Sequence, residues 1–306
     1  PQINNLAYLF KYDSTYGKFN GDIKVSDNIL SIDNKETIVT SFDNLLDVPW
    51  KENDIDLIID SSGLGFNAKK AKELTDLKIV KKAVITHSSK DTDCEIIMGV
   101  NDEILSSNHD VVSNSICDAN AIAHIMKWFD DEYKIENGSL TTLHPWLGYQ
   151  NLVDGSVASY SSPGLIWEDY ALGRSSVSSL IPKKTTAMTA TELVLPNLEG
   201  KIMSFSYRVP TSIVASSDIT LNLSEELSKE SIIDFLMQKS KNSPYVNCNL
   251  ESLTSVDYEK SESSAIIDLQ WLEVNKKTVK VVLWYDNEWG YSSRVIDLCN
   301  RISDFI

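Results

Sequence analysis

The chain has few basic residues. Its 28 lysines and arginines stand against 44 aspartates and glutamates, and the formal net charge is −16. A protein that binds a phosphate backbone needs a basic face, so binding to nucleic acid is disfavoured. The sequence also lacks an apolar run long enough to cross a bilayer, so no membrane partner is expected.

Cysteine is scarce as well. The four cysteines, at positions 94, 117, 248 and 299, show neither metal-ligand pairs nor the density of a disulfide scaffold. This favours a reducing, cytoplasmic location, and no bound metal is expected. With 306 residues, 42% of them hydrophobic, the chain can bury one large core or two ordinary ones, and two domains are expected.

The first part of the chain has the pattern of an α/β protein. Residues 55–60 and 79–86 form short apolar runs, and the helical stretch 67–77 lies between them. A third strand at 110–113 leads into a helix that begins at Cys117. The pattern predicts a Rossmann-like parallel sheet with ligands at the carboxyl ends of its strands.

After residue 138 the pattern changes to longer alternating segments, which predict an α+β domain with a mixed or antiparallel sheet. The expected strands are 139–143, 202–209, 213–223, 265–273 and 277–285. The expected helices are 187–195, 229–241 and 292–304. We therefore predict a dinucleotide-binding domain formed by residues 1–116 with 290–306, and a catalytic domain formed by residues 117–289.

The segment SNSICDAN, residues 113–120, places Cys117 at the start of a helix. The unpaired N–H groups and the dipole of a helix N-terminus favour a thiolate, so Cys117 is a candidate nucleophile. His144 follows 27 residues later in TTLHPWLGYQ and is the candidate base. Of the other histidines, His87 is interpreted as a loop residue.

These segments, together with DSSGLGF (60–66), IIMGVN (96–101), RVPTS (208–212) and WYDNEWGYSSRV (284–295), follow one another in the order and spacing of a known family. The chain resembles the phosphorylating glyceraldehyde-3-phosphate dehydrogenase family over nearly its whole length. The resemblance implies an NAD(P)-dependent oxidoreductase that acts on a small aldehyde through a thiohemiacetal and a thioester on Cys117, with His144 as base.

The resemblance also implies cofactor contacts. Asn287 and Tyr291 fall where the family orients and packs the nicotinamide, and Ser62 and Gly63 fall at a strand end that contacts the cofactor. Pro1 aligns just after the acidic residue that binds the adenosine ribose. Roughly 30 to 35 residues, about one βαβ unit with the glycine-rich phosphate turn, would then be missing before Pro1, so either the chain is a fragment of a longer protein or the protein lacks half of its dinucleotide site.

Phosphate recognition departs from the family pattern. The family's hydroxyl residues are replaced here by Ile116, Asp118, Ala119 and Leu147. Candidate anion-binding residues nevertheless remain; they are Arg208, Arg174, Lys183, Lys184 and Thr185. We therefore expect altered phosphate recognition and poor activity with triose phosphate.

Several alternatives stay open. The eroded phosphate site also fits a catalytically altered paralogue that acts as a binding or structural protein, and a Cys–His pair could support hydrolysis without a cofactor. The acyl acceptor could be phosphate or water. The long segment Ser156–Thr186 matches an element through which the family's subunits contact one another, so a homotetramer is expected.

Overall fold

The computed structural model describes residues 2–157 and 169–306. The chain divides into two compact units, Pro1–Asn53 and Asp54–Ile306, and each is described by itself. None of the helices within the described residues is long and apolar enough to span a membrane. The part of the expected inter-subunit loop at 158–168 lies outside the described residues.

The first unit is built from short elements, to which the sequence patterns assign no structure. These are α1 (Ile3–Lys11), β1 (Tyr12–Asp13), β2 (Gly17–Lys18), β3 (Ile23–Ser26), β4 (Ile29–Ile32), β5 (Lys35–Ile38) and the 3-10 helix η1 (Leu45–Asp47). Strands β3, β4 and β5 form an antiparallel sheet. Asp33 and Asn34 both have positive φ, as the two-residue turn of a tight hairpin requires.

The second unit contains the predicted parallel sheet. Its strands are β6 (Leu57–Asp60), β7 (Lys82–Ile85), β8 (Cys94–Glu95) and β9 (Val111–Ser113). They lie in the order β6-β7-β9-β8, and every pair is parallel. The predicted Rossmann-like sheet is thus confirmed.

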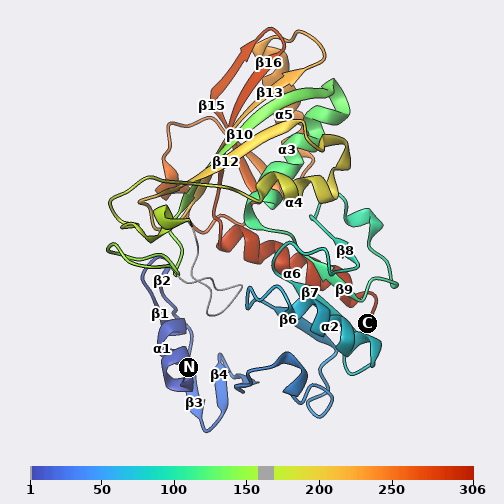
Figure 1. Ribbon diagram of the computed structural model, residues 1–306, viewed down its shortest axis with the longest axis vertical. Coiled ribbons are helices and arrows are strands. Elements are labelled where there is room, and N and C mark those ends of the chain that lie inside the picture. The colour runs from blue at the N-terminus through green and yellow to red at the C-terminus, as the bar shows by residue number, and fades with distance from the viewer. Residues whose placement is uncertain (1, 158–168) are drawn as a thin grey trace. The chain divides into compact units, whose positions relative to one another are not determined.

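Helices pack on this sheet. α2 (Asn67–Asp76) follows β6 and buries Ala68, Ala71 and Leu74. The C-terminal helix α6 (Trp289–Ser303) packs Val295 and Leu298 into the same core cluster as Val84 of β7 and Val112 of β9 (Figure 1). The end of the chain therefore returns to the parallel sheet.

The larger sheet has seven strands in the order β11-β12-β10-β13-β16-β15-β14. They are β10 (Ile135–Pro145), β11 (Ile181–Lys183), β12 (Ile202–Val209), β13 (Ala215–Leu223), β14 (Val246–Asn249), β15 (Ala265–Asn275) and β16 (Thr278–Tyr285). The pairs β10–β12 and β14–β15 are parallel and the others are antiparallel. The sheet is therefore mixed, as predicted.

Helices cover one face of this sheet (Figure 1). They are α3 (Cys117–Tyr133), α4 (Ala187–Val194) and α5 (Lys229–Lys241). Phe129, Met188 and Phe235 from these helices share one buried cluster with sheet residues such as Leu221 and Leu283. The remaining 3-10 helices are η2 (Asp102–Ile104), η3 (Tyr170–Gly173), η4 (Pro196–Leu198) and η5 (Ser255–Tyr258).

Candidate active site

The turn between β9 and α3 places Cys117 at the first residue of a 17-residue helix. The chain turns at Ser115, whose φ is +57°, and Ile116 is extended with no side-chain cap. The buried carboxylate of Glu95 fixes the turn, since it accepts hydrogen bonds from the hydroxyls of Ser88, Ser113 and Ser115. The backbone N–H of Asp118, at the start of α3, lies beside the sulfur.

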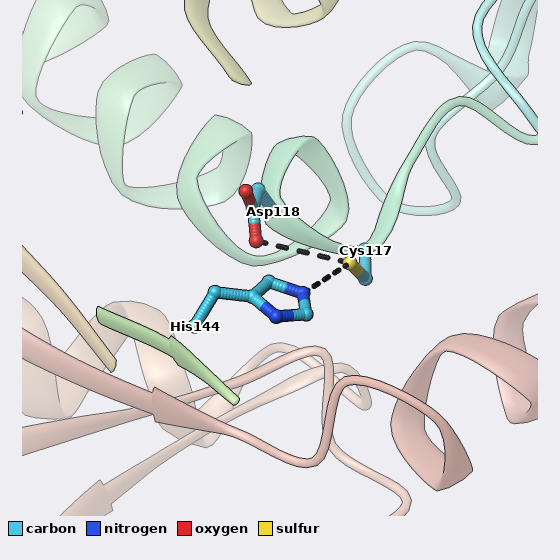
Figure 2. A group of neighbouring side chains, drawn as sticks. All are labelled: Cys117, Asp118 and His144. Carbon is cyan, nitrogen blue, oxygen red and sulfur yellow. Dashed lines mark hydrogen bonds between the residues drawn. The ribbon is translucent and has the colours of Figure 1, made fainter. Parts of the chain in front are cut away.

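His144 faces Cys117 from the end of β10. Its Nε2 lies 3.7 Å from Sγ of Cys117 (Figure 2). Its Nδ1 lies 2.9 Å from the carbonyl oxygen of Pro145, which can only accept a hydrogen bond. Nδ1 therefore carries the proton, and the lone pair of Nε2 points to the sulfur. This is the arrangement that a general base needs.

The imidazole of His144 is neutral at physiological pH. The side chain is 5% exposed, and burial lowers its pKa to about 4. Arg208 lowers the pKa further, whereas Asp118 opposes the shift. The predicted pairing of Cys117 with His144 is therefore present, with His144 in the form that can accept a proton.

Asp118 is the third member of the cluster. Its Oδ1 lies 3.7 Å from Sγ of Cys117 and accepts a 2.7 Å hydrogen bond from the hydroxyl of Tyr285. Burial, and then the charge of Asp118, raise the pKa of the Cys117 thiol well above its usual value, and Arg208 only partly opposes them. Burial and Asp118 therefore act against the thiolate expected from the helix N-terminus, which stays a prediction.

Two cationic side chains, Arg208 on β12 and Lys183 on β11, act electrostatically on His144. Arg208 is opposite His144 in the parallel register of β10 and β12, and it is 7% exposed. It donates a hydrogen bond to the hydroxyl of Tyr149, while its Nε is buried without a partner among the described residues. Burial and the charge of Arg208 lower the pKa of Lys183 on β11 to about 8. This pair could bind an anion.

The other candidate anion ligands have different surroundings. Arg174 forms an ion pair with Asp154 at 2.9 Å, and both side chains are largely exposed. Lys184 is exposed. The hydroxyl of Thr185 accepts a hydrogen bond from the N–H of Ala187 at the start of α4. The geometry thus brings Arg208 and Lys183 to the Cys–His pair and gives Arg174 a different partner.

The cofactor candidates include a buried atom without a partner. Asn287 is 7% exposed, and its Oδ1 has no hydrogen-bond partner within the described part of the chain. An amide oxygen in that state suits the N–H₂ of a nicotinamide carboxamide. The hydroxyl of Tyr291 donates to the carbonyl of Ser115, just before Cys117. These residues therefore fit the cofactor that the sequence predicts.

Ser62 and Gly63 follow the carboxyl end of β6 and are exposed. The hydroxyl of Ser62 accepts hydrogen bonds from the N–H of Leu64 and from Nδ2 of Asn67. A Cβ added to Gly63 would meet no atom within 4 Å, although its φ of +72° favours glycine. This loop is thus pre-formed at the sheet edge where nucleotides bind.

Sequence reasoning misses three polar groups of this region. The alternating pattern places Tyr285 in a strand and gives it no role in the site, yet its hydroxyl binds Asp118. At the carboxyl ends of β6 and β7, Oδ2 of Asp60 and both ring nitrogens of His87 are buried without a partner among residues 2–157 and 169–306. Their position at the carboxyl ends of two predicted parallel strands is the signal that could have identified Asp60 and His87.

Two family profiles match the chain. "Glyceraldehyde 3-phosphate dehydrogenase, NAD binding domain" matches residues 1–68, and "Glyceraldehyde 3-phosphate dehydrogenase, C-terminal domain" matches residues 116–287. Among similar proteins, glyceraldehyde-3-phosphate dehydrogenase 2 of Bacillus subtilis is 33% identical over 303 residues, which are 97% of this chain and 86% of that protein. Glyceraldehyde-3-phosphate dehydrogenase of Sclerotinia sclerotiorum is 35% identical over 97% of this chain and 86% of its own length.

Proposed function

Because the chain belongs to the glyceraldehyde-3-phosphate dehydrogenase family, we propose that it oxidises an aldehyde with NAD(P) through a covalent bond to Cys117. The observation that carries the proposal is the 3.7 Å contact between Sγ of Cys117 and the unprotonated Nε2 of His144. A protonated thiol beside a neutral imidazole can attack a carbonyl once the imidazole removes the proton.

The chemistry of the chain's own residues follows from this geometry. Sγ of Cys117 bonds to the carbonyl carbon, the C=O π pair moves to oxygen, and the thiol proton passes through Nε2 of His144 to that oxygen. Nε2 then takes the hydroxyl proton back as the thioester forms. Bound NAD(P) supplies the acceptor for the hydride that leaves the same carbon. An incoming phosphate or water attacks the thioester carbon, and the sulfur leaves and takes the proton held on Nε2 of His144. Attacking water releases its own proton to the solvent.

We propose Asn287 and Tyr291 as the residues that hold the nicotinamide end of the cofactor. The support is the unpartnered Oδ1 of Asn287 and the bond from Tyr291 to the turn before Cys117. Ser62 and Gly63 would contact the cofactor at the parallel sheet. Asn287→Ala should weaken binding of NAD(P) by roughly 2- to 13-fold in a fluorescence titration, since one buried hydrogen bond contributes about 0.5 to 1.5 kcal/mol.

We also propose that phosphate recognition is altered. The support is local: Asp118 puts a buried carboxylate beside the nucleophile, and Ile116, Ala119 and Leu147 offer no side-chain hydroxyl. An anionic substrate would instead use Arg208 with Lys183, and Lys184, Thr185 and Arg174 remain candidates for a longer substrate.

Steady-state assays test both proposals. We expect low kcat/KM with glyceraldehyde 3-phosphate and a weak response to inorganic phosphate. The combined change Ile116→Ser, Asp118→Thr, Ala119→Thr and Leu147→Thr should raise kcat/KM for triose phosphate more than for an unphosphorylated aldehyde. Ordinary efficiency in the parent would contradict altered recognition. No turnover with any aldehyde, with intact NAD(P) binding, would favour the altered paralogue.

We propose a homotetramer. In addition to the loop Ser156–Thr186, the support is an apolar patch on the outer face of the large sheet, where Leu143, Met203 and Phe205 are exposed on β10 and β12. Phe205→Asp should lower the mass found by ultracentrifugation, whereas Phe42→Asp, at a similarly exposed phenylalanine, should not. A monomeric parent at micromolar concentration would refute the proposal.

A cytoplasmic location is proposed on the scarcity of paired cysteines. Among the similar proteins, one from Gracilaria gracilis is named as cytosolic and one from Guillardia theta as chloroplastic, so the family occurs in more than one compartment. Cell fractionation with an antibody to the chain tests the location.

A further inference from the structure

We propose that Cys117, Asp118 and His144 form a reversible zinc-binding site, which would switch the proposed enzyme off. Each residue offers one ligand atom: the sulfur of Cys117, a carboxylate oxygen of Asp118 and a ring nitrogen of His144. These three atoms lie within 4.8 Å of one another. Figure 2 shows the three side chains converging, two from the start of α3 and one from the end of β10. The inference shares Cys117 and His144 with the proposed function.

The distances suit a tetrahedral zinc ion. Zinc lies about 2.3 Å from sulfur and about 2.0 to 2.2 Å from nitrogen or oxygen, which puts neighbouring ligand atoms roughly 3.5 Å apart. Sγ of Cys117 lies 3.7 Å from both Nε2 of His144 and Oδ1 of Asp118. The ligand atoms of His144 and Asp118 lie within 4.8 Å of each other, so an ion could bind once these two side chains move closer together. Three protein ligands leave the fourth position for water.

Neighbouring groups hold two of the ligands in place. The carbonyl of Pro145 accepts the hydrogen bond of Nδ1 of His144, so the lone pair of Nε2 points into the cluster. The hydroxyl of Tyr285 donates to Oδ1 of Asp118. Partners of this kind around a metal site fix the orientation of its ligands.

The charges around the site act on a bound cation in opposite directions. Asp118 is 7% exposed and places a carboxylate oxygen 3.7 Å from the sulfur, which favours a cation. Arg208 and Lys183 lie near enough to act on His144 electrostatically, and they oppose a second positive charge. We therefore infer moderate, reversible affinity.

Zinc at this position would inhibit the reaction directly. It occupies the sulfur that must attack the carbonyl and the Nε2 that must take the proton, so zinc and aldehyde exclude one another. Asp118 is what distinguishes this site from a bare Cys–His pair, because it adds a third ligand and a second negative charge.

The test is a zinc titration of the whole chain, without aldehyde or nucleotide, in competition with a chromogenic chelator. We expect one zinc per chain in the parent. Asp118→Asn, which is close in size, should weaken binding at least tenfold, and Cys117→Ser should weaken it more. Cys94→Ser should bind zinc as the parent does, because Cys94 lies on β8 outside the cluster. Circular dichroism checks that each variant is folded.

A second measurement reports on the ligands themselves. Cobalt(II) in place of zinc should give a thiolate-to-metal absorption band that is absent from Cys117→Ser and present in Cys94→Ser. Tyr285→Phe keeps all three ligands, so it should retain the band with weaker affinity. This variant keeps the test valid if Asp118→Asn does not fold.

The inference is overturned if the parent binds no stoichiometric zinc, if Cys117→Ser binds it equally well, or if folded Asp118→Asn keeps the parent's affinity. Its failure is distinct from failure of the proposed function. Zinc binding without turnover of any aldehyde would refute only the enzymatic proposal, and turnover without zinc binding would refute only the metal site.

Discussion

Removal of the charge on Asp118 should make Cys117 more reactive. The carboxylate oxygen lies 3.7 Å from the sulfur, so a thiolate there is repelled by it. Two unit charges about 4 Å apart interact by about 1 kcal/mol in water and about 4 kcal/mol at an effective dielectric constant of 20. Cys117 is partly buried, so the repulsion lies between these limits.

These energies set the expected rate. A change of about 1.4 kcal/mol alters an equilibrium tenfold, so Asp118→Asn should raise the thiolate fraction by roughly fivefold to several hundredfold. A thiolate of lower pKa is a weaker nucleophile, and about half of the gain on a logarithmic scale is lost. We therefore expect alkylation of Cys117 at neutral pH to become roughly 2 to 30 times faster.

Limiting iodoacetamide followed by peptide mass spectrometry measures this rate for each cysteine. Cys94 and Cys299 are internal references, because burial raises the pKa of Cys94 to about 12 and that of Cys299 to about 11. Asp131→Asn is the matched control, since it removes the same charge from the exposed side of α3. The reasoning is refuted if Asp118→Asn reacts no faster than the parent, or if Asp131→Asn reacts equally fast.

Three further outcomes are expected in urea unfolding. Burial lowers the pKa of His124 to about 3 and that of His144 to about 4. As the pH falls below about 6.5, only the unfolded chain takes up protons at these two histidines. The free energy of unfolding should therefore fall by up to about 1.4 kcal/mol per pH unit for each histidine. His124→Gln should flatten the decrease between pH 7 and pH 5, and an unchanged slope would contradict this. Gly138→Ala should lower the free energy of unfolding by at least about 1 kcal/mol more than Gly148→Ala does. A Cβ at position 138 would lie 2.5 Å from the carbonyl oxygen of Thr220, whereas a Cβ at position 148 would meet no atom within 4 Å. Equal losses for the two variants would refute this prediction. Tyr285→Phe should lower the free energy of unfolding by about 1 to 3 kcal/mol, because it removes the hydrogen bond to Asp118. Tyr258→Phe should change it little, because the Tyr258 hydroxyl is buried without a partner among the described residues. The reverse order would contradict the hydrogen bond assigned to Tyr285.

Much of the second unit could be predicted from hydrophobic periodicity. The strands expected at 202–209 and 277–285 match β12 and β16 closely, and the helix expected at 229–241 is α5. The short strands β6, β7 and β9 were predicted because they lie in apolar runs, whereas β8, β11 and β14 lie in no such run and are too short to show alternation. The strands of the first unit are equally short and lie in no continuous apolar run, so the same limit applies to them.

The candidate site was predictable only in part. The pairing of Cys117 with His144 followed from motif order, but the bond from Tyr285 to Asp118 joins residues 167 positions apart and no local pattern encodes it. The protonation of the thiol also depends on tertiary burial. A helix N-terminus favours a thiolate, whereas burial and a neighbouring carboxylate, which only the packed structure reveals, raise the pKa of the thiol.

The protonated thiol has a consequence for how this site can be activated. Asp118 raises the pKa of Cys117 because it is a negative charge at 3.7 Å, and by the same Coulomb interaction a positive charge arriving at the sulfur lowers that pKa. The two cations that the site is proposed to receive, zinc and the oxidised nicotinamide ring, would thus both favour the thiolate. Their effects on the reaction differ, because zinc bonds to the sulfur and to Nε2 of His144, whereas a ring held by Asn287 and Tyr291 leaves both atoms free to react. With Asp118 beside it, the Cys117 thiol therefore loses its proton more readily once a cation binds nearby. A cation that bonds to the sulfur and to Nε2 inhibits the reaction, and one that leaves both atoms free permits it.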